Sequence, residues 1–173
     1  MFTIIIIAAI YGVTMKLADL CDEHGLRVFR GDAIVFGILW GIFGSLLVLM
    51  DEHTANILLA MNLAFIVRGR LDYRNHQVAA SLIILTFLFS SPIHPFLSGA
   101  FYVTFVTLGS VKDYMGDVVK KSGPHATFFE LMPYYPLPTL LYSLLSNNWV
   151  VFTAFFTYTI SYNAVKYIIR PTT

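Results

Sequence analysis

Two pairs of acidic residues occur at spacings that put their side chains on a common helix face. Asp19 and Asp22 are three residues apart, and Asp113 and Asp117 are four residues apart. Residues at these spacings lie one above the other on a helix. Because like charges so placed weaken a helix by about 0.2–0.5 kcal/mol, helix stability does not favour them. A divalent cation between the carboxylates would reverse the sign of that interaction, so these four residues are candidate catalytic and metal-binding residues.

The cation that the paired carboxylates suit is Mg²⁺. Proteins typically hold Mg²⁺ with one or two carboxylates and the phosphate oxygens of a substrate, and arginine side chains bind further phosphate oxygens through paired hydrogen bonds. Arg68 and Arg70 are candidates for that contact, and Lys112 and Asn62 are further candidate substrate-binding residues. The alternative interpretation is that the acidic residues are solvated loop charges that balance basic residues of the same loops.

The composition places these residues in a membrane protein. Hydrophobic residues make up 57% of the 173 residues and charged residues 12%, whereas a soluble domain carries about 25% charged residues. A formal net charge of +1 without a basic block is not typical of a nucleic-acid-binding protein. The single cysteine, Cys21, excludes an internal disulfide and a multi-cysteine metal site.

Seven apolar segments are candidate membrane-spanning helices, since a helix needs about 20 apolar residues to cross a bilayer. They are residues 3–20, 33–50, 54–68, 77–92, 95–111, 134–147 and 148–168. Pro136 and Pro138 interrupt the sixth segment, which leaves five or six spans with a re-entrant segment as an alternative. The sequence therefore predicts an all-α, polytopic protein of the cell membrane, with about seven spans in one transmembrane domain over residues 1–173.

The distribution of basic residues gives this protein an orientation, because Lys and Arg collect in cytoplasmic loops. With seven spans, all eleven basic residues fall on one side: Lys16, Arg27, Arg30, Arg68, Arg70, Arg74, Lys112, Lys120, Lys121, Lys166 and Arg170. The opposite loops, 51–53, 90–95 and 146–148, contain none. This places the N-terminus outside and the C-terminus in the cytoplasm.

Small and polar residues within the helices have structural interpretations. Gly37, Gly41 and Gly44 put small residues on one side of the second segment, a pattern that lets membrane helices approach closely. Asn62 lies in the middle of the third segment, where it can hydrogen-bond to a neighbouring helix or contact a ligand.

The histidines do not predict a transition-metal site. His24, His76 and His125 fall on the cytoplasmic side, but they are scattered over three loops without the spacing of metal ligands. His53 and His94 fall on the other side and are interpreted as loop histidines.

Two segments resemble the aspartate-rich motifs of the UbiA superfamily of intramembrane prenyltransferases. Residues 112–117, Lys-Asp-Tyr-Met-Gly-Asp, precede Gly123 and Thr127 and resemble the second motif, D-x-x-G-D followed by Gly and Thr. Residues 19–22, Asp-Leu-Cys-Asp, precede Arg27 and more loosely resemble the first motif. Ala18, Leu26 and Ser110 stand where the family has an asparagine and two aspartates.

The resemblance, which rests on about thirty residues, implies a reduced version of the family fold. Family members have nine helices with four between the motifs, and four predicted helices separate the acidic segments of this chain. By resemblance, Asp19, Asp22, Asp113 and Asp117 would bind Mg²⁺ on a prenyl diphosphate and Arg68 would contact the diphosphate. Loss of the diphosphate would leave an allylic cation for an acceptor to capture.

The sequence leaves three functions open. The first is a membrane enzyme acting with Mg²⁺ on an isoprenoid or lipid (di)phosphate at the cytoplasmic interface, with prenyl transfer as the reaction. The second is a small transporter or channel for a cation or small solute, with Asn62 or Asn163 along its path. The third is a non-catalytic membrane subunit, and a homo-oligomer is compatible with each. Ionisable residues near the bilayer midplane mark transport pathways, and their absence from the segment centres favours the enzyme.

Overall fold

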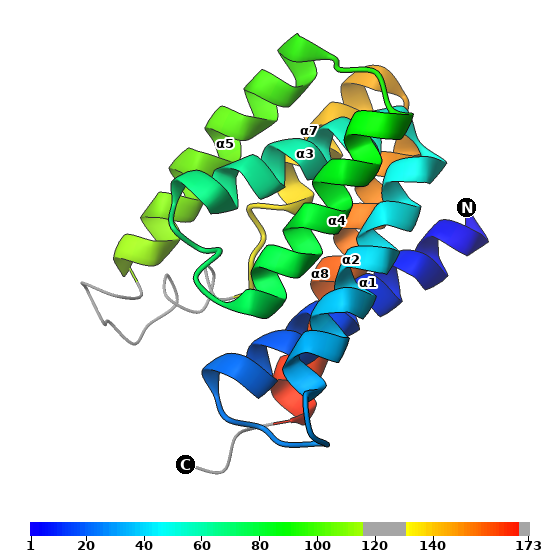
Figure 1. Ribbon diagram of the computed structural model, residues 1–173. Coiled ribbons are helices and arrows are strands. Elements are labelled where there is room, and N and C mark those ends of the chain that lie inside the picture. The colour runs from blue at the N-terminus through cyan, green and yellow to red at the C-terminus, as the bar shows by residue number, and fades with distance from the viewer. Residues whose placement is uncertain (116–130, 170–173) are drawn as a thin grey trace.

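The computed structural model describes residues 1–115 and 131–169, which form seven α-helices without a strand (Figure 1). The helices are α1 (Phe2–Glu23), α2 (Asp32–Met50), α3 (Glu52–Val67), α4 (Arg74–Ser90), α5 (Pro95–Tyr114), α7 (Pro136–Ser146) and α8 (Trp149–Ile168). The all-α prediction is confirmed for these residues, and each predicted apolar segment overlaps one of the helices.

The helices pack mainly in neighbouring pairs. α2 packs against α1 and α4, α8 packs against α1 and α7, and α3 packs against α5. A Cβ atom at Gly37 would lie 2.8 Å from the Cα of Asn75, and one at Gly41 would lie 3.1 Å from the Cα of Ala79. The first distance is shorter than real Cβ contacts and the second is tighter than most of them, so glycine at these positions lets α2 and α4 approach this closely. The predicted packing role of the small residues in α2 is confirmed.

The sixth predicted segment is a short helix preceded by a non-helical stretch inside the bundle. Pro136 and Pro138 lie in the first turn of α7, where proline costs no helix hydrogen bond. The preceding residues Met132 and Tyr134 are buried, and the Nδ2 of Asn163 donates a hydrogen bond of 2.9 Å to the carbonyl of Leu131. The 11 residues of α7 rise only about 17 Å.

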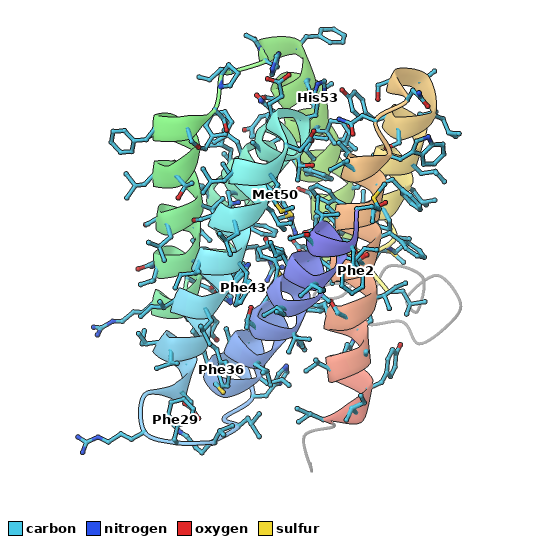
Figure 2. All side chains as sticks on the ribbon, turned by 90° about the vertical axis from the view of Figure 1, so that its right-hand side faces the viewer. Phe2, Phe29, Phe36, Phe43, Met50 and His53 are labelled. Atoms are coloured by element: carbon cyan, nitrogen blue, oxygen red, sulfur yellow. The ribbon has the colours of Figure 1, made fainter. Side chains whose placement is uncertain are left out.

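Much of the bundle's outer surface is apolar. Figure 2 shows Phe36, Phe43 and Met50 along one side of α2, with Phe29 just before the helix. Two helices, α1 and α2, are long and apolar enough to span a membrane, and α3 is a shorter apolar helix of 16 residues.

Candidate functional site

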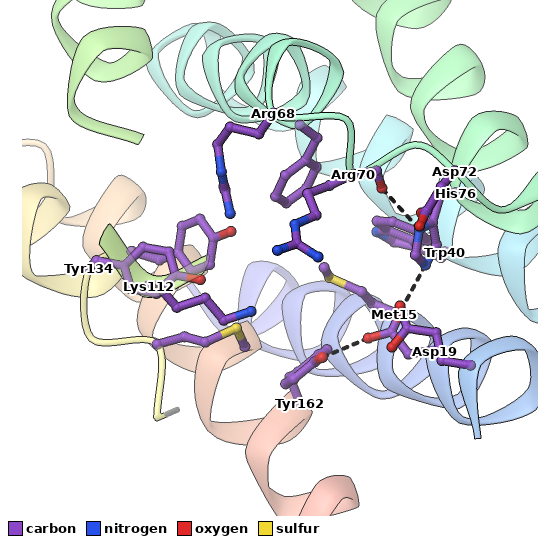
Figure 3. A pocket seen from close by; sticks show the side chains of 14 residues that line it. Met15, Asp19, Trp40, Arg68, Arg70, Asp72, His76, Lys112, Tyr134 and Tyr162 are labelled. Atoms are coloured by element: carbon purple, nitrogen blue, oxygen red, sulfur yellow. Dashed lines mark hydrogen bonds and ion pairs between the residues drawn. The ribbon is translucent and has the colours of Figure 1, made fainter. Parts of the chain in front are cut away.

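A cavity of about 160 Å³ opens where α1 and α3 end and α4 begins. Its aromatic and thioether wall consists of Met15, Trp40, Phe65, Met132, Tyr134 and Tyr135. Its polar wall consists of Asp19, Glu23, Arg68, Arg70, Asp72, His76, Lys112 and Tyr162. Figure 3 shows Arg68, Arg70 and Lys112 reaching into the space opposite Asp19 and His76. The cavity thus brings a group of cations to face a carboxylate and an imidazole.

The turn that ends α3 positions the two arginines. Gly69 has a φ of +67°, a left-handed conformation that glycine adopts without steric cost. The N–H of Gly69 bonds to the carbonyl of Ile66, and the N–H of Arg70 bonds to the carbonyl of Phe65 at 2.9 Å, the pair of bonds that defines a Schellman motif. Arg68 and Arg70 therefore flank a fixed turn and face the same cavity.

Asp113 holds both guanidinium groups and does not line the cavity. Its Oδ2 accepts hydrogen bonds from the Nε and Nη2 of Arg68 at 3.0 and 2.6 Å, and its Oδ1 lies 2.7 Å from the Nη2 of Arg70. Both carboxylate oxygens are thus occupied by cations. In the structure Asp113 is the counter-ion of the two arginines, and the metal-ligand role expected for it from the sequence stays a prediction. The Nζ of Lys112 lies 3.7 Å from Asp113. Lys112 lines the cavity, which is compatible with the substrate-binding role expected for it.

A glycine on α5 makes room for Arg68. A Cβ atom at Gly109 would lie 2.1 Å from the Nη1 and 2.3 Å from the Cζ of Arg68. The guanidinium group therefore lies against the backbone of α5, at a position where any other residue would displace it.

Asp19 joins three helices at the other wall of the cavity. Its Oδ1 lies 2.9 Å from the Nε2 of His76 on α4, and its Oδ2 accepts a 2.6 Å hydrogen bond from the hydroxyl of Tyr162 on α8. The Nζ of Lys16 lies 3.8 Å from the same Oδ2 and donates to the hydroxyl of Tyr162. Asp19 is 6% exposed, so these groups take the place of water around its carboxylate.

His76 is held in the orientation that metal ligands commonly have. Its Nδ1 lies 3.1 Å from the carbonyl of Arg70, and a metal-binding histidine usually donates its second N–H to such an acceptor. The Nε2 then points towards Asp19, and one ligand atom each from Asp19, Glu23 and His76 lie within 4.8 Å of one another. Without a metal, both ring nitrogens face oxygen acceptors, which only the doubly protonated ring satisfies.

The other predicted site residues lie elsewhere. Asp22 lines a separate pocket with Arg27 and Arg74, because Asp19 faces α4 while Asp22 faces the loop between α1 and α2. This separates the predicted pair. Asp117, the partner predicted for Asp113, lies outside the described residues.

Asn62 does not reach the cavity. It is fully buried within α3, and its Nδ2 donates a hydrogen bond of 2.8 Å to the carbonyl of Leu58 one turn earlier. The structure places Asn62 away from the cavity lining, and its substrate-binding role stays a prediction.

Two residues that line the cavity, Glu23 and Tyr162, were not predicted from the sequence, nor were Lys16 and Gly109, which contact residues of its wall. His76 was discounted because the histidines on its side are scattered over three loops without the spacing of metal ligands. Glu23 could have been predicted from the sequence, because it stands four residues after Asp19. Residues four apart share a helix face just as residues three apart do.

Comparisons of the chain with protein-family models, with curated proteins and with solved structures found no match. The resemblance to the UbiA superfamily therefore stays a prediction from the two acidic segments.

Proposed function

We propose that the chain is a multi-pass membrane protein that binds an isoprenoid or other lipid carrying a phosphate or diphosphate in this cavity, together with a divalent metal ion. The observation that carries the proposal is the placement of Arg68, Arg70 and Lys112 across one cavity from Asp19, Glu23 and His76. Prenyl transfer is the reaction that the UbiA resemblance implies for such a ligand.

The surface chemistry of the helices supports the membrane environment. Every helix that the structure describes exposes large apolar side chains, among them Leu88, Phe89, Phe96 and Leu145, whereas monomeric soluble proteins rarely expose large contiguous apolar patches. Between residues 77 and 111, and again between residues 131 and 165, the sequence has no Asp, Glu, Lys or Arg. A bilayer is the environment in which such a surface is stable.

The short helix α7 fits a crossing made in two parts. Residues 131–135 continue into α7, so the stretch from Leu131 to Ser146 covers more depth than the helix alone. Irregular backbone is tolerated within a membrane where it lines a cavity or is buried in protein, and Met132, Tyr134 and Tyr135 line the cavity. We infer six continuous crossings and one broken crossing, an odd number that puts the two termini on opposite sides of the membrane. The positions of the basic residues then put the N-terminus outside and the C-terminus in the cytoplasm.

Cysteine labelling tests this topology in intact cells in a Cys21→Ala background. Cysteines introduced at Ile93 and Ser146 are expected to react with an impermeant thiol reagent from outside. Those introduced at Arg30 and Arg74 are expected to react only after the cells are permeabilised. Labelling of Arg30→Cys or Arg74→Cys from outside would show that the orientation is wrong.

The cation side of the cavity suits a phosphate group. Hydrogen bonds between ionised partners are short and strong, and arginine can give two to one phosphate. Arg68, Arg70 and Lys112 line the same cavity, where a ligand phosphate would accept hydrogen bonds from their charged groups.

The opposite side suits the metal ion. Mg²⁺ is the ion that the resemblance implies, and the nitrogen of His76 favours Mn²⁺, Fe²⁺ or Zn²⁺ over Mg²⁺. A bound ion neutralises the charge that develops on a departing diphosphate. Asp19, Glu23 and His76 would hold the ion, and His76 must lose its Nε2 proton for this.

The aromatic wall supports prenyl transfer in particular. In that reaction the bond between the allylic carbon and the diphosphate oxygen breaks, the diphosphate leaves with the bonding electrons, and the acceptor captures the cation and loses a proton. Aromatic rings attract cations through their faces, and Trp40, Tyr134 and Tyr135 line the cavity. The structure gives less support to a transporter with Asn62 or Asn163 along its path, because the Nδ2 atoms of both residues donate to carbonyls of their own helices.

The proposal is tested by ligand binding to the purified protein in nanodiscs. We expect a prenyl diphosphate to bind more tightly than the prenyl monophosphate, and the free prenyl alcohol and inorganic diphosphate to bind weakly. Arg70→Gln should weaken diphosphate binding by about 10–100-fold, since a hydrogen bond to a charged group contributes about 1.5–3 kcal/mol. Arg30→Gln, in the loop between α1 and α2, is the matched control and should bind like the wild type. Equal affinity for the alcohol and the diphosphate would rule out phosphate recognition.

A further inference from the structure

A second cavity lies at the opposite end of α3 from Arg68. Its volume is about 390 Å³, and its apolar wall is built from Pro95, Phe96, Leu97 and Phe101. Two histidines, His53 at the start of α3 and His94 just before α5, and Tyr142 of α7 complete the wall. The 16 residues of α3 separate the two cavities by about 24 Å. Figure 2 shows His53 at the end of the bundle away from Phe29.

The two histidines share one carboxylate. Their rings are stacked, with centroids 5.6 Å apart and an interplanar angle of 21°. The Nε2 of His53 lies 3.6 Å from one oxygen of Glu52, and the Nε2 of His94 lies 3.7 Å from the other. These distances are too long for hydrogen bonds. Each histidine approaches a different oxygen of Glu52, so the three side chains must turn for their ligand atoms to reach the separation of about 3.4 Å that tetrahedral Zn²⁺ requires.

The remaining ring contacts leave both Nε2 atoms available. The Nδ1 of His53 is hydrogen-bonded to the hydroxyl of Tyr142. Metal-binding histidines commonly have their second ring nitrogen held in this way, which fixes the orientation of the ring. The Nε2 of His94 is buried and has no hydrogen-bond partner within the described part of the chain. A buried nitrogen without a partner is costly, and a metal ion at this position would remove that cost.

Asn56 fixes His94 beside α3. Its Nδ2 donates to the carbonyls of Glu52 and Pro92 at 2.8 and 2.9 Å. Its Oδ1 accepts from the N–H of His94 and the hydroxyl of Ser98, both at 2.8 Å. All four hydrogen-bonding positions of this fully buried amide are therefore used to hold the loop between α4 and α5 against the first turn of α3.

We propose that Glu52, His53 and His94 form a transition-metal site, with an open coordination position towards the apolar cavity. Two imidazoles and one carboxylate are donors that Zn²⁺, Fe²⁺ and Co²⁺ accept, and three protein ligands with one open position are typical of catalytic metal sites. The side chains of Glu52, His53 and His94 are 52%, 32% and 41% exposed, so an ion can enter from solvent and the ligands can turn onto it. The loops at this end contain no Lys or Arg to compete with the ion.

The site is tested by titrating purified protein with Co²⁺, followed by competition with Zn²⁺. The parent protein carries His76→Gln, so that the other candidate metal group does not contribute. We expect the parent to bind one Co²⁺ with a visible absorption band. His53→Ala and His94→Ala should each weaken binding by more than about 100-fold, and Tyr142→Phe, which removes only the orienting hydroxyl, by about 10–100-fold. His24→Ala, at the end of α1, is the control and should bind like the parent.

A measurement of metal-free thermal unfolding separates loss of the site from loss of the fold. The two alanine variants and Tyr142→Phe are expected to unfold, without metal, near the temperature of the parent. Equal Co²⁺ affinity in the parent, His53→Ala and His94→Ala would overturn the proposal, as would a parent that binds no Co²⁺. Neither result would bear on phosphate binding at the other end of α3.

Discussion

Asp113→Asn is expected to destabilise the metal-free protein by about 3 kcal/mol, because removing one partner of a buried ion pair leaves the other charge uncompensated. The side chain of Arg68 is only 6% exposed, and that of Asp113 is 16% exposed, so water cannot replace the lost carboxylate at Arg68. Arg70, at 39% exposed, recovers part of its solvation, and we therefore take the lower end of the usual range. The measurement is the free energy of unfolding in detergent with a chelator present.

The sign of this change separates two roles for Asp113. A metal ligand that is repelled by a neighbouring carboxylate would leave the metal-free protein equally or more stable when neutralised. A counter-ion of two arginines must leave it less stable. Asp22→Asn is the matched control, with an expected change within about 0.5 kcal/mol. A metal-free Asp113→Asn protein as stable as the wild type would return Asp113 to the metal-ligand role.

Glu23→Gln and Asp22→Asn are expected to differ sharply in metal affinity although they are neighbours in the sequence. Glu23 lies with Asp19 and His76 in the candidate metal group, whereas Asp22 lines a different pocket. Glu23→Gln should weaken Mn²⁺ binding by about 10–100-fold, and Asp19→Asn by more, because Asp19 is the buried carboxylate of the group. Titration with Mn²⁺, monitored by its paramagnetic resonance signal, gives these affinities.

The pH dependence gives a further check on the same ligands. Metal binding requires His76 to release its Nε2 proton, so the affinity should fall as the pH is lowered. His76→Gln should weaken binding and reduce that dependence. Weaker binding in Asp22→Asn than in Glu23→Gln would instead support the aspartate pair predicted from the UbiA resemblance.

The helices were predictable because each contains an apolar stretch, and most of these stretches end at charges or prolines. The predicted segment 33–50 and α2 differ by one residue at the start, since Asp32 and Asp51 bound the run. The non-helical stretch before α7 was harder to predict from the sequence. Pro136 and Pro138 marked the interruption, but only the packing of Met132 and Tyr134 inside the bundle shows why the chain stays buried without being helical there.

The sequence predicted which end of the bundle carries the site, but not which charged residues pair with one another there. Asp19, Arg68, Arg70 and Lys112 do line one cavity, because the basic and acidic residues of the chain gather at the same ends of their helices. The pairing of charges was not predictable. Whether Asp113 faces a metal or an arginine depends on how α3 and α5 cross, and that depends on the contact between Gly109 and the guanidinium group.

The central claim is that one cavity binds the phosphate and the metal ion together, and a double-mutant cycle tests it most directly. Asp19→Asn, Arg70→Gln and the double variant are compared for binding of a prenyl diphosphate at a fixed Mn²⁺ concentration. If the ligand joins the two walls, removing either wall should remove most of the affinity, and the double variant should lose less than the sum of the single losses by about 0.5–3 kcal/mol. Losses that add within about 0.5 kcal/mol would show that the two groups share no ligand, and would contradict the proposed site.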